Sequence, residues 1–114
     1  MTPIDEYYEG LKEPEQSVLL AINEIILSAD PRLNLQWKYQ MPFICLRKKM
    51  FCYSRIDKKS GELYISFADG YRMEHPELVS DGRKRFKLLY LNQERDLPIR
   101  TIQAVVILAI EKHK

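Results

Sequence analysis

The chain has 114 residues, a formal net charge of +2, 46% hydrophobic and 30% charged residues. This length and composition fit one globular domain with a single core and exclude a second domain. The longest apolar run, residues 104–110, is too short to cross a membrane, which takes roughly 18 or more apolar residues. Residues 1–10 contain acids where a secretory signal carries Lys or Arg, so we expect a cytoplasmic protein.

Charge is distributed unevenly along the chain. Residues 1–30 contain seven acidic residues and one lysine, a net charge of −6, whereas the remaining 84 residues sum to +8. We therefore expect the molecule to have an acidic end and a basic end. Solvated surfaces also produce this polarity, so it does not by itself identify a partner.

Two amphipathic helices are predicted at the start of the chain. The first carries one apolar stripe and ends near Gly10 and Pro14. The stripe consists of Ile4, Tyr7, Tyr8 and Leu11. The second helix starts at Pro14 and keeps helical spacing of apolar residues until Asp30 and Pro31 stop it.

Strands follow the two helices. Leu35, Trp37 and Tyr39 alternate with polar residues, which predicts a half-buried strand that Met41-Pro42 should break. Further strands are predicted at 43–47, 50–56, 62–68 and 86–91. A closing helix is predicted from Pro98 to about residue 112. This order indicates an α+β fold with a five-stranded, mostly antiparallel sheet. Two N-terminal helices and one C-terminal helix are expected to pack on one face of this sheet.

A family resemblance rests on several segments taken together. These are WKYQMPF, FCYS, LYISFADG, GRKRFKLLY and a terminal amphipathic helix, in this order. The chain resembles the YdhG-like family of domains of unknown function over nearly its whole length. The resemblance implies a frataxin-like fold, and one branch of the family has been proposed as an intracellular iron chaperone. Lys48-Lys49 departs from the family pattern, which often has a glycine in this turn.

The segment WKYQMPF, residues 37–43, allows two interpretations. Alternation places Trp37 on the same face as Leu35 and Tyr39, which favours a tryptophan in the core. The alternative is that Trp37 and Tyr39 line a ligand pocket.

The two cysteines are predicted to be neighbours. If Lys48-Lys49 is a two-residue loop, Cys45 lies opposite Cys52, with Cβ atoms about 5 Å apart. Such a pair could serve redox chemistry or bind a soft metal, but two thiols do not complete a zinc site. Buried free thiols are the other interpretation.

Acidic residues of the first helix form a candidate metal site. Glu6, Glu9 and Glu13 would share one helical face, and Asp5 and Glu9 another edge. Clustered carboxylates bind hard cations, and the resemblance to proposed iron chaperones points to iron. The alternative is a solvated acidic face.

Basic residues near the fifth strand form a candidate anion-binding site. Arg83, Lys84, Arg85 and Lys87 surround Phe86 after a turn. Four cations there could hold phosphate groups or single-stranded nucleic acid, or could protect an edge strand from aggregation. We expect His75, which has no second imidazole or thiol nearby in sequence, to be a loop residue.

The sequence contains no catalytic motif, so we expect a binding protein and not an enzyme. Its most concrete form is frataxin-like iron handling, with iron ions or an iron-acceptor protein as partners. The competing hypothesis is a module that binds anions through residues 83–87; nucleic acid is the less favoured ligand, and no membrane partner is expected. A protein-interaction domain with a dipolar surface is the third hypothesis.

Overall fold

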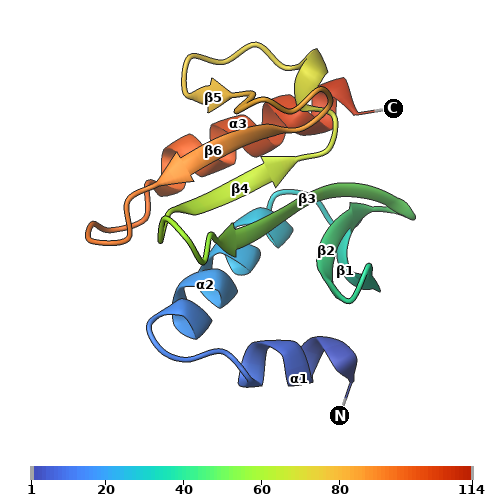
Figure 1. The fold of residues 1–114 in the computed structure, drawn as a ribbon. Coiled ribbons are helices and arrows are strands. Elements are labelled where there is room, and N and C mark those ends of the chain that lie inside the picture. The colour runs from blue at the N-terminus through green and yellow to red at the C-terminus, as the bar shows by residue number, and fades with distance from the viewer. Residues whose placement is uncertain (1, 114) are drawn as a thin grey trace.

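A six-stranded antiparallel sheet and three α-helices make up the computed structural model, which describes residues 2–113 (Figure 1). The helices are α1 (Pro3–Glu9), α2 (Glu15–Leu27) and α3 (Ile99–Lys112). The strands are β1 (Leu33–Lys38), β2 (Met41–Leu46), β3 (Lys49–Ile56), β4 (Leu63–Phe67), β5 (Leu78–Val79) and β6 (Lys87–Leu91), with a short 3₁₀ helix η1 (Gly70–Arg72) between β4 and β5. The mixed α+β class is confirmed. The sheet has six strands, one more than the predicted five. The additional strand, β5, was not predicted because it has only two residues and therefore no alternation of apolar and polar residues.

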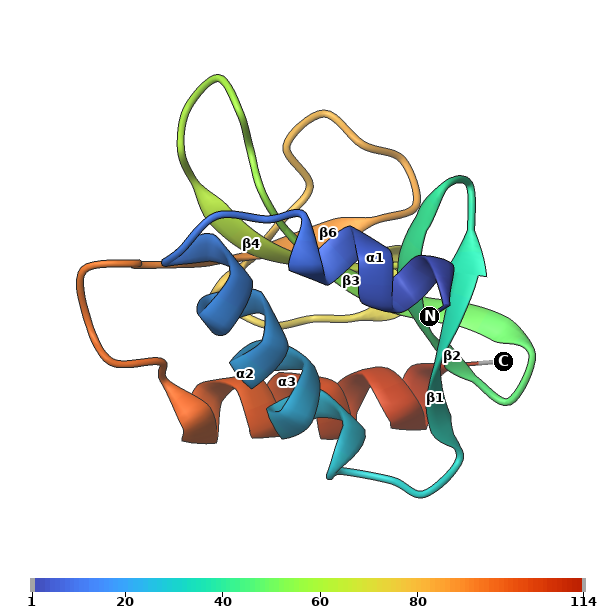
Figure 2. The same ribbon diagram turned by 90° about the horizontal axis from the view of Figure 1, so that it is seen from below.

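The strands follow the order β1-β2-β3-β4-β6-β5, and every neighbouring pair is antiparallel. Helices α2 and α3 pack against each other behind the sheet, and α1 crosses beside β1 and β2 (Figure 2). The main apolar core lies between these helices and the sheet. Its fully buried members include Leu19, Ile22, Ile65, Ile102 and Val105. Among residues 2–113, no helix combines the length and apolar character needed to span a membrane.

A capping box starts α1. The backbone N–H of Asp5 donates to Thr2 Oγ1 at 3.1 Å, and the Thr2 N–H donates to Asp5 Oδ2 at 3.3 Å. The helix then places Tyr8 in the core, where Asn23 Nδ2 of α2 donates to the Tyr8 hydroxyl at 2.8 Å. Because each buried polar group has the other as its partner, this contact fixes α1 against α2 without leaving an unpaired group.

Trp37 is not a core residue, so the core interpretation is wrong. This residue is 40% exposed on the edge strand β1. Its ring contacts Tyr7 of α1, with the two ring centroids 6.2 Å apart. The first predicted strand does end before Met41-Pro42, but it ends at Lys38, the corner is the turn at residues 39–40, and Pro42 lies inside β2. Strand β2 begins at Met41 and pairs with β3 only from Ile44 onward, so Pro42 interrupts no bond between these two strands.

The β2–β3 turn is formed one residue earlier than predicted. Arg47 adopts a φ of 59°, Leu46 pairs with Lys49, and a bulge then shifts the register. Cys45 therefore lies opposite Met50, and Cys52 lies opposite Ile44, so the predicted Cys45–Cys52 pair is wrong. Both cysteines are free and buried.

The face of the sheet opposite α2 and α3 carries a row of aromatic side chains. Edge-to-face contacts, with ring centroids 5.0–6.3 Å apart, connect the rings in sequence across the strands. The row is Tyr39, Phe43, Tyr53, Tyr64 and Tyr90, and Phe86 joins it at Tyr53. One end of this row, at Tyr39, reaches the cavity described next.

Candidate anion-binding site

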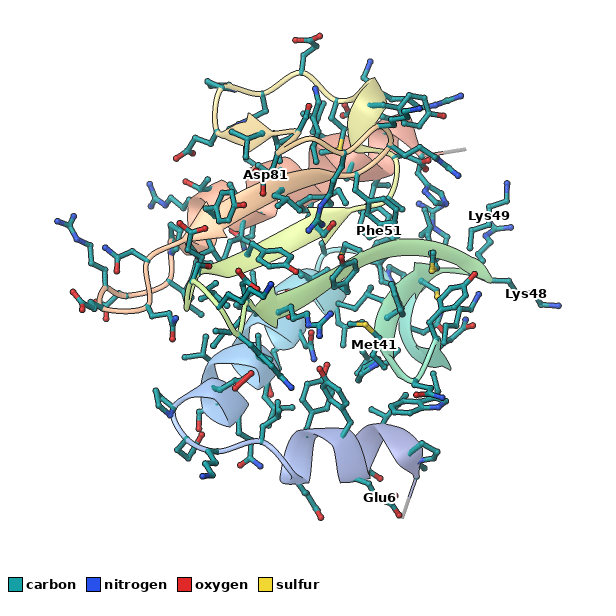
Figure 3. All side chains as sticks on the ribbon, in the orientation of Figure 1. Glu6, Met41, Lys48, Lys49, Phe51 and Asp81 are labelled. Atoms are coloured by element: carbon teal, nitrogen blue, oxygen red, sulfur yellow. The ribbon has the colours of Figure 1, made fainter. Side chains whose placement is uncertain are left out.

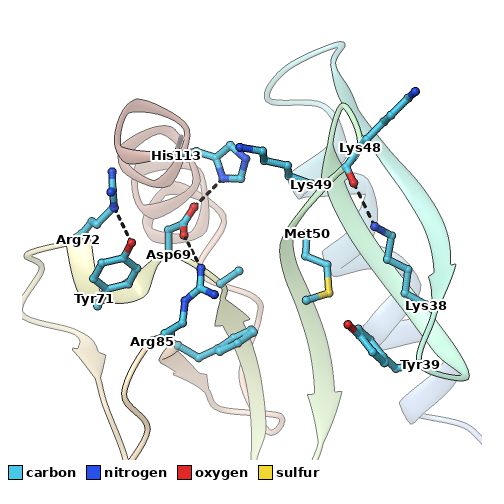
Figure 4. A pocket seen from close by; sticks show the side chains of 12 residues that line it. Lys38, Tyr39, Lys48, Lys49, Met50, Asp69, Tyr71, Arg72, Arg85 and His113 are labelled. Carbon is cyan, nitrogen blue, oxygen red and sulfur yellow. Dashed lines mark hydrogen bonds and ion pairs between the residues drawn. The ribbon is translucent and has the colours of Figure 1, made fainter.

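A cavity of about 490 Å³, which we call the basic cavity, lies between the β2–β3 turn and η1 (Figure 4). Tyr39 and Met50 line one side, and Tyr71 and Arg85 line the other. Five Lys or Arg residues line it, and they come from four separate segments: Lys38, Lys48, Lys49, Arg72 and Arg85. The side chain of Lys48 extends away from the cavity (Figure 4). Such a volume is typical of small-molecule sites, which measure about 300–1,000 Å³.

Close packing at Gly70 places η1 beside β6. A Cβ atom added to Gly70 would meet the Lys87 backbone nitrogen, the Lys87 Cβ at 2.5 Å and the Lys87 Cα at 2.9 Å. The Tyr71 N–H then donates to the Arg85 carbonyl at 2.8 Å. These contacts hold the η1 side chains and Arg85 on the same wall of the cavity.

Asp69 joins two basic groups of this wall. Its Oδ1 lies 3.4 Å from Arg85 Nη2, and its Oδ2 accepts from His113 Nδ1 at 2.9 Å (Figure 4). His113 follows α3, and its ring also packs edge-to-face on Phe51, with centroids 5.7 Å apart. The carboxylate therefore fixes the orientation of the His113 imidazole.

The second ring nitrogen of His113 has no partner within residues 2–113. The side chain is 8% exposed, and its Nε2 atom is buried without a hydrogen bond. Buried polar atoms usually have a partner, so this nitrogen is an exception among the described residues.

Further contacts hold the side chains on both walls of the basic cavity. Lys38 Nζ donates to the Lys48 carbonyl at 3.0 Å, which ties the end of β1 to the β2–β3 turn. The Lys49 side chain extends toward the His113 ring (Figure 4). On the η1 side, Arg72 Nε donates to the Tyr71 hydroxyl at 2.8 Å.

The electrostatics of the basic cavity favour an anion. Asp69 is the single carboxylate among its described lining residues, and it already interacts with Arg85 and His113. Cations that converge on a concave surface raise the local concentration of anions. Arg and Lys side chains form charge-assisted hydrogen bonds with phosphate and carboxylate oxygens.

A second cavity of about 490 Å³ adjoins the first and shares Lys48, Lys49 and His113 with it. Leu46 and Ile110 line this second cavity, so it is less polar.

Of the four basic residues predicted as an anion site, only Arg85 lines the basic cavity. Arg83 lies over the Tyr64 ring, 5.6 Å from its centroid, and Lys84 is exposed. Lys87 Nζ donates to the Met73 carbonyl at 2.7 Å. The four basic side chains therefore point to different places, because residues 83–86 form a loop and only Lys87 lies in β6.

Of the four acidic residues predicted as a metal site, Asp5, Glu6 and Glu9 lie in α1 and Glu13 lies outside it. Asp5 caps α1, and Glu6 points away from the domain (Figure 3). Helix α1 ends at Glu9, and the Glu13 carboxylate beyond it accepts from the Ser17 N–H at 2.8 Å and from the Ser17 hydroxyl. Among residues 2–113, no three His, Cys, Asp or Glu side chains are gathered closely enough to hold a metal ion. Iron binding stays a prediction that rests on the resemblance.

The remaining candidates have structural contacts. His75 Nδ1 accepts from the Glu77 N–H at 3.1 Å, within a loop. Burial raises the pKa of the Cys52 thiol, with a smaller contribution from Cys45, and burial also raises the pKa of Cys45. Neutral, buried thiols are poor nucleophiles.

Sequence reasoning missed most of the basic cavity. Lys38, Lys48, Arg72 and His113 lie far apart along the chain, and no local spacing connects them.

Comparisons of the chain with family models, curated proteins and solved structures find no match.

Proposed function

We propose that this domain binds a small anion, such as a phosphate ester, in the basic cavity. The single observation that carries the proposal is the gathering of five Lys or Arg residues from four segments around a cavity whose one described carboxylate is already paired. This is the anion-binding hypothesis from the sequence, moved to a new place. Of the residues in that hypothesis, Arg85 belongs to the proposed site. Arg83, Lys84 and Lys87 do not, and the other cations of the site come from other segments.

A binding role fits the arrangement better than catalysis does. The cavity offers donors and one oriented imidazole, and the two described thiols are buried. That the domain is not an enzyme, and that it belongs with YdhG-like proteins, stay predictions.

Calorimetric titration with inorganic phosphate and pyrophosphate tests the proposal. Arg85→Gln should weaken binding by roughly tenfold, because it removes a charge-assisted contact. Lys84→Gln is the matched control, since it removes one cation from the same loop but from outside the cavity. Binding should also weaken as salt rises, because salt screens partly exposed charges.

An equal effect of the two substitutions would contradict the proposal. It would show a general attraction to the positive surface instead of a site.

A further inference from the structure

The β1–β2 turn holds an exposed aromatic ring at the basic cavity. The Tyr39 side chain is 81% exposed, the highest value among the large apolar and aromatic residues that lie at the surface, and it lines the cavity. Its ring packs edge-to-face on Phe43, with centroids 6.1 Å apart, and remains open to solvent elsewhere. Burial in the core therefore does not explain this ring.

The backbone of the turn is strained. Tyr39 and Gln40 adopt φ angles of 51° and 61°, in the left-handed region. Hairpin turns of this kind usually contain Asn or Gly, because other side chains crowd the backbone there. Strain of this sort gathers at functional sites, and one of the two strained residues of this turn, Tyr39, lines the cavity.

The other rings of the cavity are less available. Guanidinium carbons of Arg72 and Arg85 lie 5.3 and 5.8 Å from the Tyr71 centroid, so cations already interact with that ring. Phe86 is half-buried and contacts Tyr53. Tyr39 is therefore the ring with the most open surface for a ligand.

We propose that the ligand is a phosphate ester that carries a planar aromatic ring. The phosphate lies among the cations, and the aromatic ring stacks on Tyr39, which faces Arg85 from the other side of the cavity (Figure 4). This inference rests on the proposed function. It adds that the ligand carries an aromatic ring besides its phosphate group. Stacking of a planar ring on an aromatic side chain should tighten binding by about tenfold.

Two matched pairs of ligands test the inference by calorimetry. Phenyl phosphate and cyclohexyl phosphate have rings of similar size, but only the first is aromatic. Adenosine 5′-monophosphate and ribose 5-phosphate differ by a nucleobase. A preference of about tenfold for the aromatic member of either pair supports the inference, and the pair that shows it tells whether the ring sits on the phosphate or beyond a sugar.

Equal affinity within both pairs would overturn the inference but not the proposed function, provided that inorganic phosphate still binds. Failure of every ligand to bind would overturn both.

Two glycine substitutions separate the ring from the strain. Tyr39→Gly and Gln40→Gly should each raise the melting temperature, because glycine adopts a positive φ without crowding. Only Tyr39→Gly should remove the aromatic preference, whereas Gln40→Gly, which changes the neighbouring residue of the same turn outside the lining of the basic cavity, should keep it. Tyr39→Phe should keep the preference. A Tyr39→Gly variant that still prefers the aromatic ligands would overturn the inference.

Discussion

The Nδ1 atom of His113 lies 2.9 Å from the Oδ2 atom of Asp69, and this contact joins the end of α3 to the segment that follows β4. Among residues 2–113, the Nε2 atom on the other side of the ring is buried and has no hydrogen-bond partner. When the ring is protonated, Nε2 donates, and when the ring is neutral with its proton on Nδ1, Nε2 accepts. The Asp69–His113 pair therefore sets whether Nε2 donates or accepts a hydrogen bond.

Removal of the Asp69 charge should strengthen anion binding. Asp69→Asn keeps an oxygen that accepts from His113 but removes the negative charge nearest to Arg85. An interaction of roughly 1 kcal/mol between partly solvated charges corresponds to about a fivefold gain in phosphate affinity. Calorimetric titration at low salt measures it. A loss of affinity would contradict this electrostatic role, because it would show that the carboxylate matters more for orientation than for charge.

A methyl group at Gly70 should destabilise the fold. Gly70→Ala drives a Cβ atom into the Lys87 backbone, which is part of β6 and cannot move easily. The free energy of unfolding in urea should fall by about 1–3 kcal/mol, as for other cases of overpacking. Gly10→Ala is the comparison, since its added Cβ would lie 3.3 Å from the Glu6 carbonyl oxygen and needs only a small shift. Equal stability of the two variants would contradict this close approach.

The pKa of three tyrosines, Tyr8, Tyr64 and Tyr90, is raised, and Tyr90 should titrate at unusually high pH although it is exposed. The Tyr90 hydroxyl donates to Asp81 Oδ2 at 2.8 Å, and this hydrogen bond raises the Tyr90 pKa from 10.0 to about 12. Because the folded pKa is the higher one, the contact stabilises the fold fully below about pH 10 and is lost as pH rises through about 12.

Tyrosinate absorbance checks this shift. In Asp81→Asn, one tyrosine should titrate closer to pH 10, and Asn tolerates the positive φ of 47° at this position. An unchanged titration curve would show that the hydrogen bond does not form in solution.

The thiols should be inert in the folded protein. Cys45 and Cys52 are buried, and burial raises both pKa values, so little thiolate is present and reagents cannot reach it. Reaction with a chromogenic disulfide reagent should be slower by roughly two orders of magnitude than in denaturant. Rapid reaction of either thiol in the native protein would contradict this burial.

The sequence predicts the helices and long strands well because each carries its own periodicity. The stripe that contains Tyr8 and the apolar run at 62–68 are local patterns, and both produced the expected elements. The β2–β3 register is not local in this sense. It depends on the left-handed Arg47 and on a bulge, neither of which the residue types in LRKKM identify.

The candidate site was less predictable than the fold. Arg85 was found because it belongs to a visible run of cations, whereas His113 and Lys38 reach the cavity only through the packing of α3 and the edge position of β1. Ligand lining by Tyr39 was one of two interpretations of WKYQMPF, and it depends on a turn geometry that a Tyr-Gln pair does not predict.

Titration of the ¹⁵N-labelled protein with inorganic phosphate, followed through amide NMR shifts, tests anion binding in the basic cavity most directly. We predict saturable shifts at the β2–β3 turn around Lys48, at residues 69–72 and at Arg85, and these shifts should weaken as salt rises. Shifts that are absent at millimolar phosphate, or that are confined to α1, would contradict an anion site in the basic cavity.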